Sequence, residues 1–286
     1  MWVSRNGAEE ALPVPLRAYE SPRLSPDGRQ LAVAANGHIW LYDFSRRALT
    51  RFTFEGNANS RPVWTPDGAR ITFYSDKDGP LNLYWQMADG SGSLERLTTA
   101  NHTQVPHSWS PNGQVLAFQD VDPAGSDTWI LNIRDRKPQR LLQTPFAKTN
   151  PRFSPDGRWI AYESSQSGRN EIYVRPYPGP GGQSQISIDG GSEPVWSPTG
   201  RELFYRNGNK MMAAPILTEP RFLVGTPQML FEARYASLSV GVPNYDVSPD
   251  GQRFLMIKVS EPTTTPTQIN VVVNWIEELK RLVPTN

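Results

Sequence analysis

At 286 residues, the chain is long enough to bury a large core, either as two ordinary domains or as one large all-β unit. Its formal net charge of +1 provides no strongly basic surface, so we expect no nucleic-acid partner. The absence of cysteine excludes disulfides, thiolate zinc sites and a cysteine nucleophile. Nine Trp, ten Tyr and eleven Phe argue against disorder, and 27 Pro and 22 Gly between aromatic runs indicate many short strands.

The N-terminal stretch MWVSRNGAEEALPVPL reads as strand, turn and strand. It lacks the basic and apolar regions of a signal peptide, and no segment is long and apolar enough to span a membrane. We therefore expect a soluble chain without membrane insertion. The sequence is also compatible with an excised, extracytoplasmic part of a longer bacterial protein.

One short turn recurs six times along the chain. It begins as SPDGR at Ser25 and returns as TPDGA, SPNGQ, SPDGR, SPTGR and SPDGQ at Thr65, Ser110, Ser154, Ser197 and Ser248. Successive copies lie 40 to 51 residues apart, a period that is typical of repeat architectures. In each copy Pro fixes the first corner and Gly accepts the left-handed exit, and Asp or Asn suits the second corner in all copies but SPTGR.

Apolar runs flank every turn in the same order. The run before the turn ends in Leu24, Trp64, Trp109, Phe153, Trp196 or Val247. The second runs are 31–34, 71–74, 116–119, 160–163, 203–206 and 254–257, and the third are 39–42, 83–85, 128–131, 172–174, 211–212 and 269–273. A weaker fourth run completes units of about 44 residues, which is the size of a propeller blade. We predict an all-β, six-bladed β-propeller with four-stranded blades, forming a single domain over residues 1–286, with blades beginning near residues 20, 60, 105, 149, 192 and 243.

In the last unit, the spacing of apolar residues after the third run changes from that of a strand to that of a helix. In NWIEELKRLVP, Trp275, Ile276, Leu279, Leu282 and Val283 form one helical stripe, which predicts a short C-terminal helix. The sixth blade then lacks an outer strand. We expect the N-terminal segment to close the ring, with Ala11–Pro15 or Trp2–Ser4 pairing with the blade that contains Ile269–Val273.

The six copies of Ser/Thr-Pro-Asp/Asn/Thr-Gly, preceded by Trp or Phe in four of them, resemble the TolB-type propeller repeat. The end of the chain, NYDVSPDGQRFLMI followed by INVVVNWIEELKRLVP, also resembles the propeller domains appended to bacterial receptor-type serine/threonine kinases. No Gly-rich phosphate loop precedes a lysine strand here. The resemblance therefore implies a sensor or scaffold domain without the kinase domain.

Propeller geometry places the start of each innermost strand at the mouth of the central channel. Residues five and four positions before each repeat Ser then surround this mouth. Among them, Glu20, Asn150, Glu193 and Asn244 come from four blades and offer the carboxylate and amide oxygens that Ca²⁺ prefers. These four residues are our candidate ligands for one divalent cation. The set resembles the calcium ring of six-bladed propeller hydrolases that act on lactones and phosphotriesters.

Two residues are candidates for catalysis beside such a cation. His107 or the carboxylate of Glu193 could position or deprotonate a water molecule, or attack directly. Further candidate ligand contacts in the channel are Arg61, Arg23, Arg152 and Asp246. The alternative interpretation is that these arginines neutralise the carboxylates and leave no room for a metal, because polar residues are expected in any water-filled channel.

The sequence thus supports two functions. The first is a non-catalytic binding propeller, a sensor or scaffold that holds a small molecule or a protein or peptide at the channel mouth and on large loops around it, such as 75–81, 119–127, 163–170 and 258–267. The second is a divalent-cation-dependent hydrolase of esters, lactones or phosphotriesters. In both cases we expect a monomer.

Overall fold

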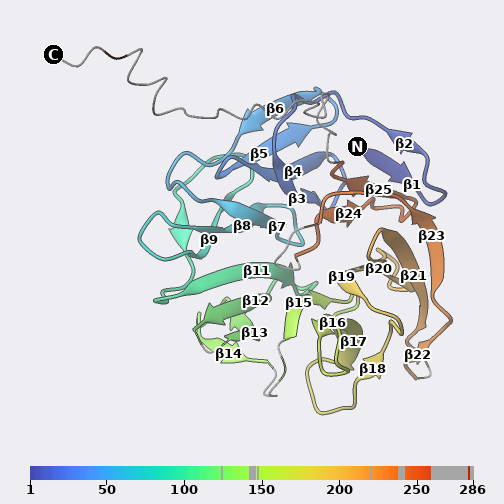
Figure 1. Cartoon of the computed structure of the whole chain (residues 1–286). Coiled ribbons are helices and arrows are strands. Elements are labelled where there is room, and N and C mark those ends of the chain that lie inside the picture. Colours follow the sequence, from blue (N-terminus) through green and yellow to red (C-terminus); the bar gives the residue numbers. More distant parts are fainter. Residues whose placement is uncertain are drawn as a thin grey trace.

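Six short strands surround a single axis in the computed structural model (Figure 1). The structure describes residues 1–123, 125–141, 146, 148–219, 221–237, 242–258 and 283. The innermost strands are β3 (Tyr19–Leu24), β7 (Ser60–Trp64), β11 (Thr103–Trp109), β15 (Lys148–Phe153), β19 (Ser192–Trp196) and β24 (Tyr245–Val247). Each of them ends immediately before one of the six repeated turns. The predicted gathering of strand starts about one axis is therefore confirmed.

Each innermost strand begins an antiparallel sheet that runs outward as one blade. Blade one is β3, β4 (Gln30–Ala35), β5 (His38–Asp43) and β6 (Ala48–Arg51), and blade two is β7, β8 (Arg70–Ser75), β9 (Asn82–Met87) and β10 (Glu95–Arg96). Blade three is β11, β12 (Val115–Asp122), β13 (Gly125–Asn132) and β14 (Pro138–Arg140), and blade four is β15, β16 (Trp159–Ser164), β17 (Glu171–Pro176) and β18 (Ser184–Gln185). Blade five is β19, β20 (Glu202–Asn207), β21 (Lys210–Leu217) and β22 (Leu223–Val224), with β23 (Gln228–Glu232) also paired to β21. The predicted six blades of four strands are confirmed.

Blade six is assembled from both ends of the described chain. Its order is β24, β25 (Arg253–Met256), β1 (Trp2–Ser4) and β2 (Glu9–Glu10), with Trp2 opposite Leu255 and Val3 opposite Phe254. Closure by Trp2–Ser4 is therefore confirmed, and Ala11–Pro15 forms no strand. β25 pairs with β24 on one side and with β1 on the other, so β1 is the third strand of the blade. The prediction that Ile269–Val273 forms this third strand is therefore wrong. That run and the predicted C-terminal helix lie outside the described residues, except for Val283, which is not helical.

The repeated turns form a ring of their own on one side of the molecule, which we call the turn face. In the first copy, Ser25 Oγ donates to Asp27 Oδ1 over 2.6 Å and accepts from Gln30 N over 2.9 Å, so the two polar side chains hold the corner. The glycine of each turn lies against the proline of the turn in the preceding blade. These pairs are Gly28–Pro249, Gly68–Pro26, Gly113–Pro66, Gly157–Pro111, Gly200–Pro155 and Gly251–Pro198.

The tryptophan that precedes several turns fastens one blade to its neighbour. Trp64 Nε1 donates to Arg23 O, and Trp196 Nε1 donates to Arg152 O, both over 3.0 Å. Trp109 Nε1 reaches Thr72 Oγ1, also in the preceding blade, over 3.2 Å. These residues are buried, so each indole adds apolar area between two sheets and satisfies its own polar atom.

We predict that removing residues 1–16 lowers the melting temperature sharply, because blade six loses two of its four strands. Trp2→Ala alone should cost about 3–5 kcal/mol, since this buried indole also contacts Phe44 of blade one at a centroid distance of 5.7 Å. Thermal and urea unfolding measure both effects. Leu16→Ser is the control, because Leu16 is 93% exposed and its replacement should change stability by less than about 0.5 kcal/mol. An unchanged melt after the deletion would contradict the closure.

Candidate functional site

The face opposite the turns, which we call the mouth face, is where the innermost strands begin. Four of these strands carry a residue with left-handed φ at the position four before the repeat Ser: Ser21 (52°), Arg61 (60°), Asn150 (55°) and Glu193 (58°). The pairing register shifts at each of these positions, as it does in blade three between Pro106 and Ser108. Such β-bulges redirect a side chain out of the regular pleat. All four side chains are buried.

The redirected residues form hydrogen bonds from blade to blade around the channel. Arg61 Nη1 donates to Ser21 Oγ over 2.7 Å, and Ser21 N donates to Asn244 Oδ1 over 2.7 Å. Asn244 N in turn donates to Glu193 Oε2 over 2.9 Å. The series therefore links blades two, one, six and five through residues that all lie four positions before a repeat Ser.

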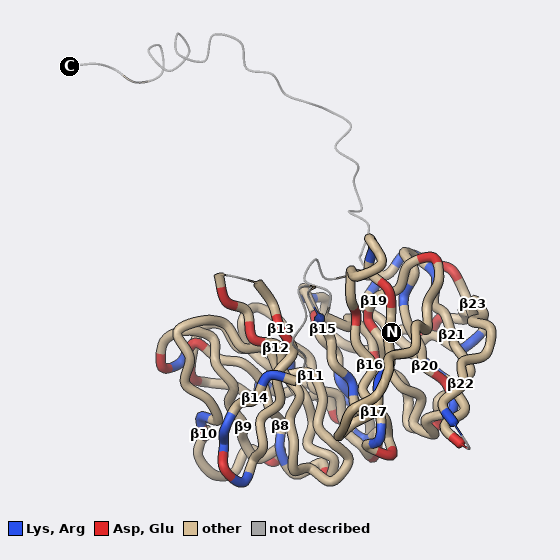
Figure 2. Tube along the Cα trace, turned by 90° about the horizontal axis from the view of Figure 1, so that it is seen from below, with Lys and Arg blue, Asp and Glu red and all other residues tan. Residues whose placement is uncertain are grey.

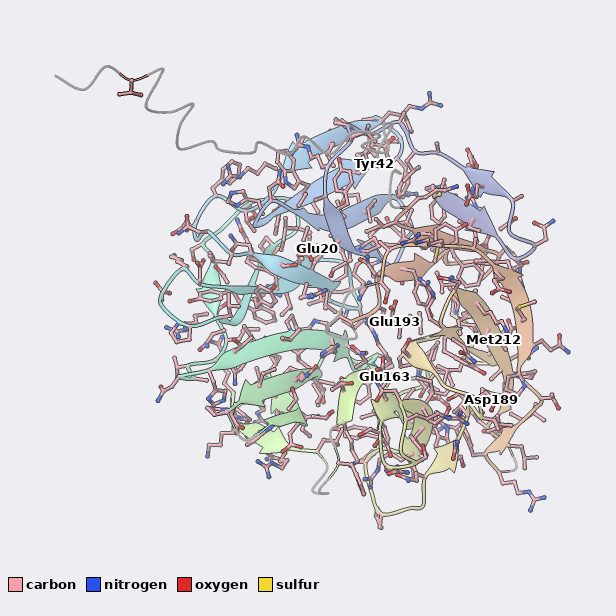
Figure 3. All side chains as sticks on the ribbon, in the orientation of Figure 1. Glu20, Tyr42, Glu163, Asp189, Glu193 and Met212 are labelled. Atoms are coloured by element: carbon pink, nitrogen blue, oxygen red, sulfur yellow. The ribbon has the colours of Figure 1, made fainter. Side chains whose placement is uncertain are left out.

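A second buried carboxylate extends this series into blade four. Glu163 Oε1, at the mouth end of β16, accepts from Glu193 N and from Asn150 Nδ2, both over 2.5 Å. Glu163 is 2% exposed. Burial raises the pKa of Glu163 to about 8, an effect that the nearby charge of Glu193 increases and the two hydrogen bonds oppose. Burial also raises the pKa of Glu193. Figure 3 shows both residues towards the centre of the ring.

The sequence analysis did not select Glu163, although a signal was present. Gln119, Glu163 and Arg206 are polar residues that end the second runs of three consecutive blades. All three are buried near the channel mouth, where Gln119 Oε1 lies 3.2 Å from His107 Nε2. Arg206 Nη2 donates to Gly208 O over 3.2 Å. A polar residue that interrupts an apolar inner run could therefore have served as a marker of the channel.

The four candidate metal ligands are brought together to different degrees. Asn244 and Glu193 are in direct contact, and Asn150 is joined to Glu193 through Glu163. The carboxylate of Glu20 has another partner: its Oε1 accepts a hydrogen bond from Ser60 Oγ over 2.7 Å. Among the described residues, no group of three or more His, Asp or Glu side chains is arranged to hold a metal ion. The calcium site therefore stays a prediction.

His107 lies inside the protein, in the bulge of β11. It is 1% exposed, and its Nδ1 is buried without a hydrogen-bond partner. Burial holds the pKa of His107 well below its usual value, and the charges of Arg152, Arg61 and Arg23 lower it further. The imidazole is therefore neutral near pH 7, so a role as a general base remains open to it and a role as a cationic acid does not.

The remaining predicted contacts come two residues later in the chain than Ser21, Asn150 and Asn244, and so further from the mouth. Arg23 Nη2 donates to Pro243 O over 2.9 Å, and Arg152 Nη1 donates to His107 O over 2.5 Å. Asp246 Oδ2 accepts from Leu24 N over 2.7 Å. Burial raises the pKa of Asp246, an effect that the nearby charge of Arg23 opposes. The channel thus holds buried groups of both signs, bonded mainly to the main chain.

Around the mouth, the segments that join one blade to the next expose apolar side chains. The last strand of each blade runs towards the mouth face, so these connections lie on it. They carry Leu16 (93% exposed), Phe54 (72%), Phe146 (45%) and Ile188 (68%), on the connections into blades one, two, four and five. The four exposed apolar side chains therefore lie on the same kind of connection in four different blades and are distributed around the mouth face.

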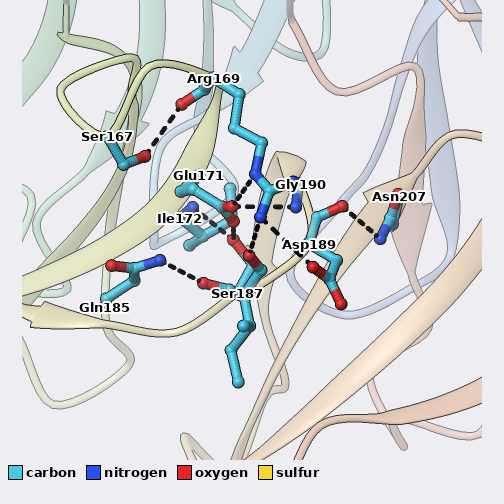
Figure 4. Close-up of polar contacts among 10 residues, drawn as sticks. Ser167, Arg169, Glu171, Ile172, Gln185, Ser187, Asp189, Gly190 and Asn207 are labelled. Carbon is cyan, nitrogen blue, oxygen red and sulfur yellow. Dashed lines mark hydrogen bonds and ion pairs between the residues drawn. The ribbon is translucent and has the colours of Figure 1, made fainter.

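Side-chain hydrogen bonds hold the start of the connections that carry Phe54 and Ile188 and of the connection into blade three, and Figure 4 shows them for the connection that carries Ile188 in blade four. Ser187 Oγ accepts from Ile172 N over 2.8 Å, and Glu171, which is 1% exposed, accepts from Gly190 N over 2.9 Å. The corresponding hydroxyls of Thr53 and Thr98 accept from Ile39 N and Leu83 N. Each exposed apolar side chain that follows such a hydrogen bond is therefore presented from a fixed backbone.

The charges elsewhere on the molecule show no comparable grouping. Figure 2 shows basic and acidic residues interspersed along the blades, which agrees with the net charge of +1. Within the described residues, no helix is long and apolar enough to cross a membrane. Among the described residues, the grouping of exposed apolar and buried polar side chains is therefore found at the mouth face and in the channel behind it.

Comparison with known proteins agrees with this architecture. The TolB beta propeller domain family matches residues 16–125 and 101–220. The uncharacterized protein Atu1656 of Agrobacterium fabrum is 27% identical over 267 residues, which cover 84% of each chain. The Tol-Pal system protein TolB of Francisella tularensis is 28% identical over 192 residues, covering 62% of this chain and 44% of that protein. A solved structure described as TolB from Agrobacterium tumefaciens superposes with a TM-score of 0.71 at 21% identity, covering 85% of this chain and 91% of that one.

The family match spans more than half of the chain, and the blades it describes are those found here. The protein belongs to the TolB beta propeller domain family.

We predict that Glu163 makes stability fall as the pH rises from about 4.5 to about 8. Its pKa in the folded protein lies above the ordinary value of 4.5, so its contribution is complete below that value and is lost as the pH rises through about 8. Unfolding by urea between pH 6 and pH 9 should show stability falling in the wild type and a flatter profile in Glu163→Gln, which keeps the acceptor Oε1. Because one pKa unit corresponds to about 1.4 kcal/mol, the difference should reach at most a few kcal/mol.

The matched control for this experiment is Asp27→Asn. Asn112 already occupies the same place in the turn of blade three, and the pKa of Asp27 is lowered from 3.8 by the Ser25 hydrogen bond, so this residue does not titrate between pH 6 and pH 9. Asp27→Asn should therefore keep the wild-type pH profile. Equal slopes for wild type and Glu163→Gln would show that the buried carboxyl does not titrate in this range.

Proposed function

We propose that the protein is a binding propeller of sensor or scaffold type, which holds a partner on its mouth face with part of that partner entering the channel. The observation that carries the proposal is the set of four exposed apolar side chains on corresponding blade connections, around the buried polar groups at the axis. Exposed apolar patches with polar surroundings are typical of interaction sites. The ring of blades acts as the rigid frame on which such loops carry specificity.

A protein or peptide partner fits this surface better than a small molecule alone. The apolar side chains come from blades that are distributed around the ring, so they can be contacted together only by a ligand that spans the mouth. The relative in Francisella tularensis is described as a Tol-Pal system protein, which agrees with action alongside other proteins. We further propose that the propeller works outside the cytoplasm, as the monomeric binding part of a longer bacterial protein.

Site-specific photo-crosslinking tests this proposal. A photoreactive amino acid at position 54 or 188 should give adducts in the producing bacterium, whereas the same group at position 217 should give none. Leu217 is the matched control because it is 60% exposed but lies on the turn face, beside Asp156 and Thr199. Gel shifts report protein adducts, and intact mass spectrometry reports small ones. Adducts confined to position 217, or equal at all three positions, would contradict the mouth face as the binding surface.

The alternative function is a divalent-cation-dependent hydrolase. It is favoured by one observation: Asn150 Oδ1 is a buried acceptor without a hydrogen-bond partner, and its amide group contacts the carboxylate of Glu163, which is bonded to Glu193 N. Oxygen ligands of this type suit Ca²⁺. A cation held there would polarise the carbonyl or phosphoryl oxygen of an ester, lactone or phosphotriester. The residues of this chain that would hold it are Asn150, Glu193, Asn244 and Glu20.

We expect the alternative to be decided by adding Ca²⁺, Mn²⁺ or Zn²⁺ to chelated protein. A bound cation should raise the melting temperature by mass action and support turnover of aryl ester, lactone or phosphotriester substrates. Glu193→Gln should abolish both effects while keeping the acceptor for Asn244 N. No metal-dependent shift and no turnover in the wild type would remove the hydrolase from consideration.

A further inference from the structure

Three arginine side chains from different blades lie close enough to the channel axis for their charges to act on His107. Arg61 comes from the start of β7, and Arg23 and Arg152 come from corresponding places near the ends of β3 and β15. Arg23 is 6% exposed and Arg61 is 7% exposed, whereas Arg152 is partly exposed. Their electric fields overlap, because Arg152, Arg61 and Arg23 all act on His107 and Arg23 also acts on Arg152.

None of these arginines forms an ion pair with a carboxylate in the described part of the chain. Arg23 Nη1 donates to Tyr245 O over 3.1 Å and Arg61 Nη1 donates to Ser21 Oγ over 2.7 Å, so neutral oxygens receive their hydrogen bonds. The Nε atoms of Arg23 and Arg152 are buried and have no partner. A buried cation is normally paired, because leaving a charge uncompensated away from water is costly.

The carboxylates in the same region compensate this charge only in part. The two whose charges act on Arg23 and Arg152 are Asp246 and Glu193. Both accept main-chain N–H groups, from Leu24 and Asn244. Burial raises the pKa of each carboxyl, and burial with repulsion from Arg23 lowers the pKa of Arg152 to about 9. The carboxylates that act on Arg23 and Arg152 are thus both harder to ionise than usual.

We propose that the channel binds an anionic group, a carboxylate or a phosphate, between Arg23, Arg61 and Arg152. The guanidinium group suits this role because it offers several N–H donors in a planar fork that matches two oxygens of an oxyanion. The partly exposed Arg152 would meet the group first. The inference rests on the proposed function, since it identifies the part of a mouth-bound partner that enters the channel as acidic.

Binding of small oxyanions to the intact chain tests the site. Inorganic phosphate and succinate, each added at constant ionic strength against chloride, should raise the melting temperature in a saturable way. Comparing the two probes shows whether phosphate or carboxylate is the preferred source of the charge. Arg152→Gln and Arg23→Gln should weaken the affinity for the preferred probe by about tenfold or more, since hydrogen bonds to charged groups are among the strongest in proteins.

Arg158→Gln is the matched control, because Arg158 lies on the turn face and is bound to Asp156 by a 2.8 Å ion pair. It should bind the probes as the wild type does. Stabilisation by phosphate that is equal in the wild type and in the channel variants would overturn the proposal, because it would reflect general exclusion of the salt from the protein surface. Absence of saturable binding by the wild type would overturn it as well.

A crystal of the wild type soaked in selenate keeps the test decisive if the arginine variants do not fold. The proposal expects an anomalous peak between the three guanidinium groups, and a channel without such a peak contradicts it. This outcome is separate from the photo-crosslinking result. A selenate peak together with a lack of adducts at positions 54 and 188 would leave the anion site in place and reject the partner-binding function.

Discussion

The contact between the proline of one repeated turn and the glycine of the next is the constraint on which the rest of the structure depends. At Gly28 a Cβ atom would lie 2.8 Å from Pro249 Cγ, and the φ of Gly28 is +70°, so both space and backbone require glycine there. Since the same pair recurs in all six blades, it sets the spacing of the blades at the turn face. The pair Gly28–Pro249 extends this spacing across the point where the chain closes on itself.

The opposite end of each innermost strand is built differently. There the bulges at Ser21, Arg61, Asn150 and Glu193 turn polar side chains out of the sheet, and these side chains are buried. Buried charge and left-handed backbone both cost stability, which the tightly packed turn face and the apolar layers between blades can offset. The architecture thus separates the two ends of the channel: the turn end holds the ring together, and the mouth end is free to carry polar groups with raised or lowered pKa values.

The charges in the channel bear on which ion it would accept. Glu163 and Glu193 provide oxygens for a cation, but burial raises the pKa of both and that of Glu163 to about 8, so a cation that uses Glu163 near pH 7 would have to displace a proton. The positive charge of Arg23, which acts on Glu193, would repel such a cation. An anion would instead be attracted, because it would reduce the electrostatic repulsion between the guanidinium groups. On electrostatic grounds the channel therefore favours a negatively charged group over a divalent metal.

The sequence by itself determined the six blades, the position of each turn and the closure of the ring by the N-terminal segment, because Pro, Gly and apolar residues act locally and recur at a fixed period; that Trp2–Ser4 and not Ala11–Pro15 forms the closing strand was decided by the structure. It also identified Glu193, Asn150 and Asn244 as neighbours near the axis. Only the tertiary structure decided what these residues do there. Glu163 enters the site from a second strand, and β1 instead of Ile269–Val273 takes the third place in blade six. Contacts of this kind join residues from different strands and blades, so the burial and charge of these residues depend on how the blades meet, even where a polar residue in an apolar run, such as Glu163, marks the position locally.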